Sequence, residues 1–416
     1  MTVKGAGVDS DPLGDVVSRQ YEQWVYPAPI FDIPDWLRRN WQWFDPSHSH
    51  TLFWPDRGYK QGMDILVAGC GTNQAAVIAY TNPLAHVVAI DVSDASLEHH
   101  RHLSTTHTLE NLELHRLPIE RVGELGQEFD LVISTGVLHH MANPGEGMSA
   151  LAACLKTDGV LAVMLYATYG RRGVQMMQSV FRDLGLTQDE PSIVMVRDAV
   201  AHLQPGHPLA TYLDLASDLG DDAGLVDTFL HGRERTFTID ECQDLVESAG
   251  LVFQDLFLKS PYYPPRKTTS AFLASIAELP REKQWSIMER VNPRNACHYF
   301  LACRAERFVT SYDIDFSATH VNNYLPSLRF ACRLEEQMIH RYDWQLQLDP
   351  VQTALVSRAD GRTDISHIVQ AVLNEEQFPG LDEKQLTHIA VETFQMLWQL
   401  DFVAMGISPH DPKIIR

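Results

Sequence analysis

The sequence predicts an α/β protein built around a parallel sheet, followed by a small, mostly helical unit. Between Met63 and about Leu165, short apolar runs alternate with stretches of helical periodicity. This alternation is typical of strands joined by helices that cover both faces of a sheet. Beyond residue 305 the alternation ends, and an amphipathic helical pattern runs through Leu386–Leu400. The 416 residues are enough for two or three domains.

The individual elements follow from local pattern. Strands are expected at residues 63–68, 86–90, 112–115, 129–134 and 159–166, where apolar runs are bounded by turn-forming residues. Two more strands are expected at Leu251–Leu258 and Cys297–Arg304, separated by a helical insert near 266–291. A capped helix is expected from Thr238 to Gly250, because Thr238 and Glu241 have the spacing of a capping box.

These elements divide into three predicted regions. Residues 1–60 are expected to form a loose tail and an aromatic cover segment, and residues 61–305 the central sheet domain. Within that domain, residues 171–235 are irregular and helical. Residues 306–416 are expected to form a helical or winged-helix-like accessory domain.

Composition excludes several classes of partner. A net charge of −21 argues against nucleic acid or an anionic membrane as the main partner. The N-terminal residues do not have the pattern of a secretory signal, and we find no apolar run long enough to span a membrane, so a cytoplasmic location is expected. The six cysteines include no CxxC pair, so neither a metal site nor a disulfide is expected.

Four short motifs follow the predicted strands. The first is a glycine-rich turn at Ala68–Asn73, and the second is the acid Asp91 at the end of the next apolar run. The third is Leu117-Pro118, and the fourth is the run from Thr135-Gly136 to Leu138-His139-His140. In a parallel sheet, ligands bind outside the carboxyl ends of the strands. A glycine turn followed by an acid one strand later is a way to hold an adenosine.

Two common nucleotide sites fit this pattern poorly. A nicotinamide dinucleotide site needs a third glycine, where this chain has Asn73 and Gln74. A P-loop needs Gly-Lys-Ser/Thr after the turn, which is missing.

Together the four motifs resemble those of class I S-adenosylmethionine-dependent methyltransferases, in particular the branch with Ala-Gly-Cys-Gly-Thr and Gly-Val-Leu-His-His motifs. The resemblance covers roughly residues 60–305. It implies a Rossmann-like seven-stranded sheet with helical lid insertions, the lid being residues 171–235. It also implies S-adenosyl-L-methionine as cofactor and in-line methyl transfer to a small molecule or peptide. A non-catalytic or non-methylating S-adenosylmethionine-binding protein on the same fold is the alternative.

The resemblance also implies roles for single residues. Asp91 would bind the ribose hydroxyls, while Leu117, Pro118 and Val92 would flank the adenine. The cofactor's ribose and methionine portions would lie against the backbone of the two glycine turns, whose residues are Ala68, Gly69, Cys70, Gly71, Asn73, Thr135 and Gly136.

The chain departs from the family pattern at two positions. Val67 replaces an acid of the first strand, and Asn73 replaces the third glycine. The missing acid commonly helps to hold the cofactor's amino group. Tyr21 and Tyr26, in the N-terminal aromatic segment, are the candidates to replace it.

Candidates for catalysis lie near the predicted lid. His139, His140 and His231 could act as a general base, and Tyr166 could orient a polar group. Arg171 or Arg172 could pair with a substrate carboxylate, with His231 also near the substrate. Purely structural roles remain open for each of them.

The C-terminal region carries one weaker signal. Leu355-x-x-Arg358-x-Asp360-Gly361-Arg362-Thr363 is similar to modules of peptide-binding carriers, but peptide recognition, dimerisation and lid support all remain open. A homodimer is one alternative for the oligomeric state.

Overall fold

The computed structural model describes residues 11–216, 219–266, 268–292 and 294–408. Within these ranges the chain divides into two compact units. One comprises residues 11–43, 62–251 and 294–298, and the other comprises residues 44–61, 252–292 and 299–408. The start of the expected tail (residues 1–10) and the end of the expected C-terminal domain (residues 409–416) lie outside the described residues.

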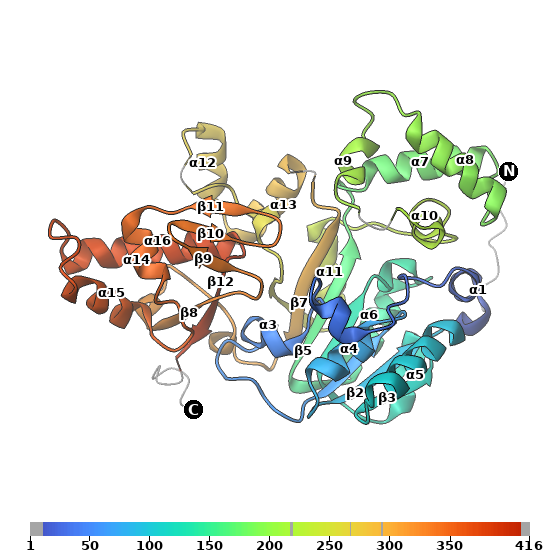
Figure 1. Ribbon diagram of the computed structural model, residues 1–416, viewed down its shortest axis with the longest axis horizontal. Coiled ribbons are helices and arrows are strands. Elements are labelled where there is room, and N and C mark those ends of the chain that lie inside the picture. Colours follow the sequence, from blue (N-terminus) through green and yellow to red (C-terminus); the bar gives the residue numbers. More distant parts are fainter. Residues whose placement is uncertain (1–10, 217–218, 267, 293, 409–416) are drawn as a thin grey trace. The chain divides into compact units, whose positions relative to one another are not determined.

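A seven-stranded sheet with the order β3-β2-β1-β4-β5-β7-β6 forms the framework (Figure 1). The pairs β1–β2, β2–β3, β1–β4 and β4–β5 are parallel, which confirms the predicted fold class. The strands are β1 (Asp64–Ala68), β2 (His86–Asp91), β3 (Leu112–Arg116), β4 (Phe129–Thr135), β5 (Leu155–Tyr166), β6 (Leu251–Leu256) and β7 (Cys297–Arg304). Of these, β5 begins earlier than the sequence pattern indicated.

The central strands are apolar on both faces because helices cover the sheet on both sides. In β1, the residues from Ile65 to Ala68 are all buried, and Ile65 pairs with Val87 of β2 and Leu131 of β4. This continuous burial explains why the strands appear in the sequence as short unbroken apolar runs.

Helices connect these strands and continue into the predicted lid (Figure 1). Around the sheet lie α4 (Gln74–Thr81), α5 (Asp94–His107), α6 (Pro144–Ala153) and α11 (Ile239–Ser248), with α1 (Val16–Gln23) and α2 (Ile33–Leu37) preceding them. The lid contains α7 (Arg172–Asp183), α8 (Glu190–Ala201), α9 (Leu209–Leu213) and α10 (Asp222–Phe229). Its helices share a small apolar core that includes Val174, Phe181, Val196 and Phe229. The predicted capping box at the start of α11 is present, with Thr238 and Glu241 bonded reciprocally.

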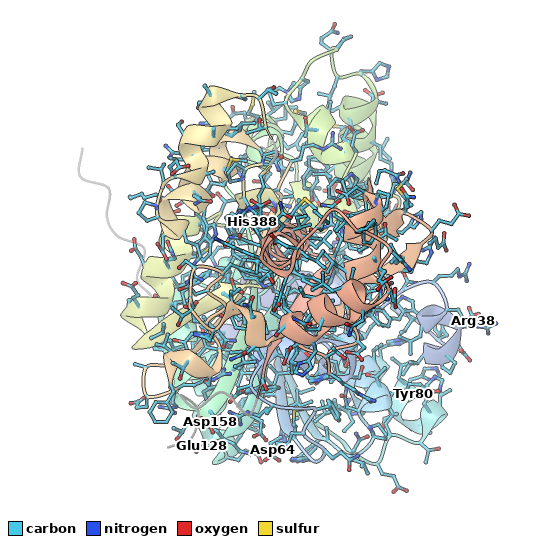
Figure 2. The ribbon with its side chains drawn as sticks, turned by 90° about the vertical axis from the view of Figure 1, so that its left-hand side faces the viewer. Arg38, Asp64, Tyr80, Glu128, Asp158 and His388 are labelled. Atoms are coloured by element: carbon cyan, nitrogen blue, oxygen red, sulfur yellow. The ribbon has the colours of Figure 1, made fainter. Side chains whose placement is uncertain are left out.

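The amino-terminal ends of neighbouring strands carry charged residues, among them Asp64, Glu128 and Asp158, which Figure 2 labels. There the ammonium group of Lys156 lies 2.5 Å from a carboxylate oxygen of Asp64 and 2.9 Å from one of Asp130. The predicted ligand motifs all lie at the opposite, carboxyl ends of the strands.

The second unit combines helices with short strands. Its described helices are α3 (Pro46–Phe53), α12 (Ala271–Ala277), α13 (Arg281–Val291), α14 (Pro350–Val356), α15 (Ile365–Asn374) and α16 (Glu383–Gln399). A three-stranded sheet contains β9 (Arg333–Glu335), β10 (Met338–His340) and β11 (Gln345–Gln347), and β8 (Tyr324–Leu328) pairs with β12 (Val403–Ile407). The sequence pattern did not predict these five strands. Among the described residues, no helix is both long and apolar enough to cross a membrane.

Candidate cofactor site and histidine cluster

The glycine turn after β1 has a backbone conformation that side chains disfavour. Gly69 and Gly71 have φ values of +75° and +53°. A Cβ atom on Gly69 would lie 2.3 Å from the Val137 side chain, so no larger residue fits. The Gly69 N–H donates to the carbonyl of Ile90 over 2.8 Å, which ties the turn to the end of β2.

Asp91 ends β2 directly beside this turn. Its carboxylate accepts hydrogen bonds from the N–H groups of Gly71 and Ser93, each over 2.9 Å. Each carboxylate oxygen keeps a lone pair, so the group can still accept hydrogen bonds from a diol. Burial raises the pKa of Asp91 to about 6, against the opposing effect of these backbone donors. The Leu117 N–H donates to the Asp91 carbonyl over 3.0 Å, which brings the third motif beside the second.

Asn73 fastens the N-terminal segment onto the turn. Its amide nitrogen donates to the carbonyl of Ala28 over 3.0 Å, and its amide oxygen accepts from the N–H of Ile30 over 3.1 Å. Thr72 adds a hydrogen bond from its hydroxyl to the carbonyl of Pro27 over 2.8 Å. The departure from glycine at position 73 therefore has a structural use, because it holds the aromatic segment in place.

The fourth motif lies at the end of β4, next to the helix that follows the first motif. Gly136 has a φ of +77°, and its N–H donates to the carbonyl of Met164 over 3.2 Å. The Thr135 hydroxyl accepts a hydrogen bond from Gln74 over 3.1 Å. The four predicted motifs are therefore brought together at one edge of the sheet.

A buried carboxylate, Asp227 of α10, joins elements that are distant in the sequence. The exposed fraction of Asp227 is 3%. One of its oxygens accepts a hydrogen bond from the Tyr21 hydroxyl over 2.8 Å, and the other accepts one from the Tyr166 hydroxyl over 3.2 Å. Burial raises the pKa of Asp227. The hydroxyl proton of Tyr21 therefore already takes part in a hydrogen bond to Asp227, a residue of the predicted lid.

Two histidines, His140 and His231, lie close to this carboxylate, and His139 lies beside His140. His139 and His140 lie in the short helix η3 (Leu138–His140), and His231 follows α10. The rings of His140 and His231 are stacked with centroids 3.7 Å apart, and His139 stacks on Tyr166 at 3.8 Å. Burial lowers the pKa of all three imidazoles below the ordinary value, so they are neutral near pH 7.

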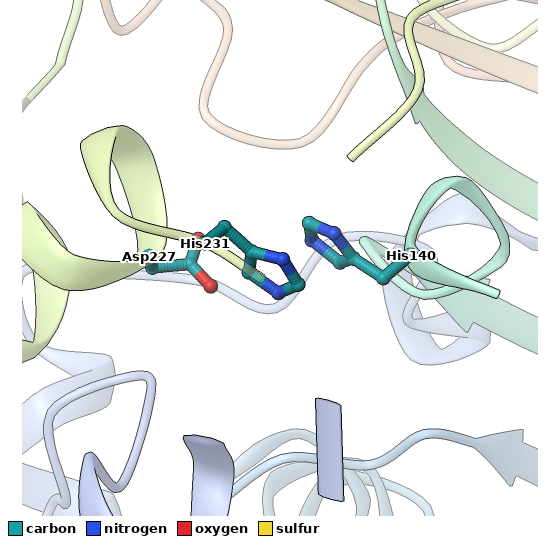
Figure 3. Close-up of side chains that lie close together, drawn as sticks. All are labelled: His140, Asp227 and His231. Atoms are coloured by element: carbon teal, nitrogen blue, oxygen red, sulfur yellow. The ribbon is translucent and has the colours of Figure 1, made fainter. Parts of the chain in front are cut away.

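His140, Asp227 and His231 lie within the reach of metal ligands, since their ligand atoms are within 4.8 Å of one another (Figure 3). An imidazole binds a metal through a lone pair in the plane of its ring, about 2.1 Å from the nitrogen. The two rings lie in near-parallel planes, with 15° between them, and cannot both direct a lone pair at one ion in this arrangement. The cluster therefore does not fit a metal centre as it stands.

The two predicted substrate arginines differ in environment. Arg171 is 1% exposed, and its guanidinium donates to Glu234 over 2.8 and 3.3 Å and to the Tyr212 hydroxyl over 2.9 Å. Arg172 is exposed and lies near the ring of Tyr169. The Arg171 side chain is thus occupied by an internal carboxylate, whereas Arg172 faces solvent.

Sequence reasoning missed the partners that organise this site. Asp227 and Glu234 received no predicted role, although both carboxylates are buried in the lid. One signal was available for Asp227, because it is an acid inside the apolar stretch Leu225–Leu230, four residues before His231. Charged residues are rarely buried without a partner.

Comparison with known proteins agrees with this architecture. Residues 59–203 match the family model of a methyltransferase domain. The chain is 28% identical over 268 residues to an uncharacterized protein of Synechococcus sp., a match that covers 62% of this chain and 63% of that protein. It is 34% identical over 116 residues to a malonyl-[acyl-carrier protein] O-methyltransferase of Acetivibrio thermocellus, covering 28% of this chain and 38% of that enzyme.

Among solved structures, PKMT2 from Rickettsia typhi in complex with AdoHcy is similar in fold. The TM-score is 0.63 at 12% identity, and the match covers 88% of this chain and 75% of that chain. The chain spans less than two thirds of the length of the two curated relatives. The sheet order, the match of residues 59–203 to a methyltransferase domain and the similarity to this neighbour agree on the class of fold: it is a Rossmann-like methyltransferase fold.

Proposed function

We propose that this protein is an S-adenosylmethionine-dependent methyltransferase that acts on a small-molecule or peptide acceptor. The observation that carries the proposal is the pairing of the Gly69–Gly71 turn with the buried carboxylate of Asp91 at adjacent strand ends. A buried acid with free lone pairs beside a glycine turn suits the ribose of an adenosine ligand. No observation on the described residues favours a non-methylating binder over an enzyme.

We assign the cofactor-binding roles as follows. Asp91 would accept hydrogen bonds from the ribose hydroxyls, with Val92, Leu117 and Pro118 beside the adenine. The methionine portion would lie against the backbone between Gly69 and Gly71 and against Thr135-Gly136. Tyr21 and Asp227 would lie toward the reacting end, because Tyr21 belongs to the segment that Asn73 fastens onto the turn.

The histidine cluster would serve the acceptor. The cofactor, when bound, supplies the methyl group, so the protein's task is to position the acceptor and to remove a proton from it where necessary. His140 has a buried ring nitrogen without a partner, and Asp227 lies close enough to stabilise a positive charge on that ring. The Arg171–Glu234 pair would support Tyr166, because the guanidinium lies 3.6 Å from the centre of the Tyr166 ring.

Isothermal titration of the full chain with S-adenosylmethionine tests the proposal. We expect binding at one site and a loss of at least about tenfold in affinity for Asp91→Ala, because an ionised hydrogen-bond acceptor is removed. Asp94→Ala is the matched control, since Asp94 is an exposed acid three residues away. Absence of binding, or equal affinity in both variants, would contradict the proposal.

A further inference from the structure

Hydrogen bonds fix the tautomers of the stacked pair of histidines. A carbonyl oxygen can only accept, so Nδ1 of His140, 2.9 Å from the Arg233 carbonyl, carries the proton. A backbone N–H can only donate, so Nδ1 of His231, 3.0 Å from the Arg233 nitrogen, carries the lone pair. The backbone of Arg233 therefore imposes opposite tautomers on two neutral rings that lie face to face.

The third ring is fixed in the same way. Nδ1 of His139 accepts a hydrogen bond from the Tyr166 N–H over 3.2 Å, so its proton is on Nε2. Nε2 of His140 therefore carries a lone pair, whereas Nε2 of His139 and Nε2 of His231 each carry a proton.

Two of these three Nε2 atoms lack a partner. Nε2 of His231 lies 3.4 Å from the Tyr21 hydroxyl oxygen, to which it donates. Nε2 of His139 and Nε2 of His140 are both buried without a hydrogen-bond partner. These adjacent residues, with ring centroids 4.3 Å apart, thus offer one unused donor and one unused acceptor. Such groups are costly inside a protein and indicate a ligand that would satisfy them.

The unused donor of His139 and the unused acceptor of His140 select among possible methyl acceptors. An ammonium group has only donors and leaves His139 unsatisfied, while a carboxylate has only lone pairs and leaves His140 unsatisfied. A hydroxyl group accepts from one ring and donates to the other. Both oxygens of Asp227 already have a hydrogen-bond donor, each from a tyrosine hydroxyl, so the acceptor that lacks a partner among these groups is Nε2 of His140. We propose that the methyl acceptor presents a hydroxyl group to His139 and His140. This inference rests on the proposed function.

The reaction that follows is a balanced O-methylation. The O–H bond breaks and its proton passes to Nε2 of His140, while the oxygen forms the new bond to the methyl carbon and the electron pair of the broken C–S bond stays on sulfur. His139 would hold the oxygen through its Nε2–H. The carboxylate of Asp227 would stabilise the imidazolium of His140 until that proton leaves to solvent.

Three probes of one shape test this assignment on the wild-type chain saturated with S-adenosylhomocysteine. Benzyl alcohol, benzylammonium and benzoate share the same ring and differ in their hydrogen-bonding group. Binding is followed through the ring ¹⁵N signals of selectively labelled histidines. His140→Phe keeps an aromatic ring against His231 but removes the lone pair. His388→Gln, which changes an exposed histidine of α16, is the matched control.

We expect benzyl alcohol to shift the signals of His139 and His140 and to bind at least about tenfold more tightly than the two charged probes. His140→Phe should abolish that preference, and His388→Gln should retain it. The inference is overturned if benzylammonium or benzoate binds equally well, or if none of the three moves these signals. Titration with S-adenosylhomocysteine separates the two levels of the argument: no binding defeats the proposed function, whereas binding with the wrong probe preference defeats only the hydroxyl assignment.

Discussion

At the scale of single residues, the proposed role of Asp91 in ribose binding conflicts with the burial of its carboxylate. A buried carboxylate is stabilised in its protonated form, and the backbone donors from Gly71 and Ser93 only partly offset this effect. Ribose recognition, by contrast, uses the ionised group as an acceptor. The residue should therefore couple cofactor binding to pH.

The pH dependence of cofactor affinity follows from this conflict. Because the pKa of Asp91 is raised to about 6, affinity for S-adenosylmethionine should be constant above about pH 7. Below the pKa it should fall by up to about tenfold per pH unit, since binding then requires release of a proton. Isothermal titrations between pH 5 and pH 8 measure this slope. Asp91→Asn should bind weakly with no step near pH 6, and a step of the same size in that variant would assign the proton to another group.

The buried ion pair of Arg171 and Glu234 leads to a prediction about stability. Arg171→Met leaves the Glu234 carboxylate without its partner, and removal of one member of a buried ion pair costs about 3–5 kcal/mol of unfolding free energy. The double variant Arg171→Met/Glu234→Met should recover part of that loss. Denaturant unfolding followed by circular dichroism measures both.

Arg172→Met is the control, because substitution of an exposed residue changes stability by about 0.5 kcal/mol or less. If Arg171→Met leaves the unfolding free energy unchanged but weakens acceptor binding, Arg171 contacts substrate and the structural role is wrong.

At the scale of elements, hydrogen bonds from Thr72, Asn73 and His99 hold the part of the N-terminal segment around Ala28. Asn73 alone bonds to the backbone of two of its residues, Ala28 and Ile30. Asn73→Gly introduces the glycine found in the methyltransferases that the sequence motifs resemble, and it deletes both hydrogen bonds. We expect faster hydrogen exchange in residues 26–32 and weaker cofactor binding, with exchange in α7 unchanged as the internal control. Unchanged exchange in residues 26–32 would mean that the aromatic side chains, not Asn73, hold the segment.

The elements that sequence could predict are those with a strong local pattern. Apolar runs such as 63–68 and 129–134 became β1 and β4 because both faces of the sheet are covered. The capping box at Thr238 was equally local. The strands β9 and β11 have only three residues each, and their side chains are exposed or half-exposed. Such short strands, as in Gln345–Gln347, do not show the alternation of apolar and polar residues that predicts a strand. The helix α15 is capped by Asp364, and the carboxylate of Asp360 accepts a hydrogen bond from the N–H of Thr363.

At the scale of the whole molecule, the candidate site depends on contacts between distant parts of the sequence. The motifs at strand ends could be predicted because parallel strands bring their carboxyl ends to one edge. The hydrogen bonds of Asp227 to Tyr21 and Tyr166 span 206 and 61 residues, and no sequence spacing encodes them. The ion pair between Arg171 and Glu234, which are 63 residues apart, could not be predicted for the same reason.

The division into two units predicts in which residues ligand binding will slow hydrogen exchange. All the residues assigned to cofactor binding belong to the unit that contains residues 62–251 or to its N-terminal segment. S-adenosylhomocysteine should therefore slow hydrogen exchange in residues 69–73, 91–93 and 135–140, and leave β8 and β12 unaffected. Hydrogen exchange with mass spectrometry makes this measurement. Strong protection of β8 or β12 would give the second unit a part in the site.

A crystal structure of the chain with S-adenosylhomocysteine tests the central claim most directly. We predict that both ribose hydroxyls will lie within hydrogen-bonding distance of the Asp91 carboxylate, with the sulfur directed toward the turn that carries His139 and His140. A nucleoside bound at another edge of the sheet, or an Asp91 that contacts only Gly71 and Ser93 in the complex, would contradict the account.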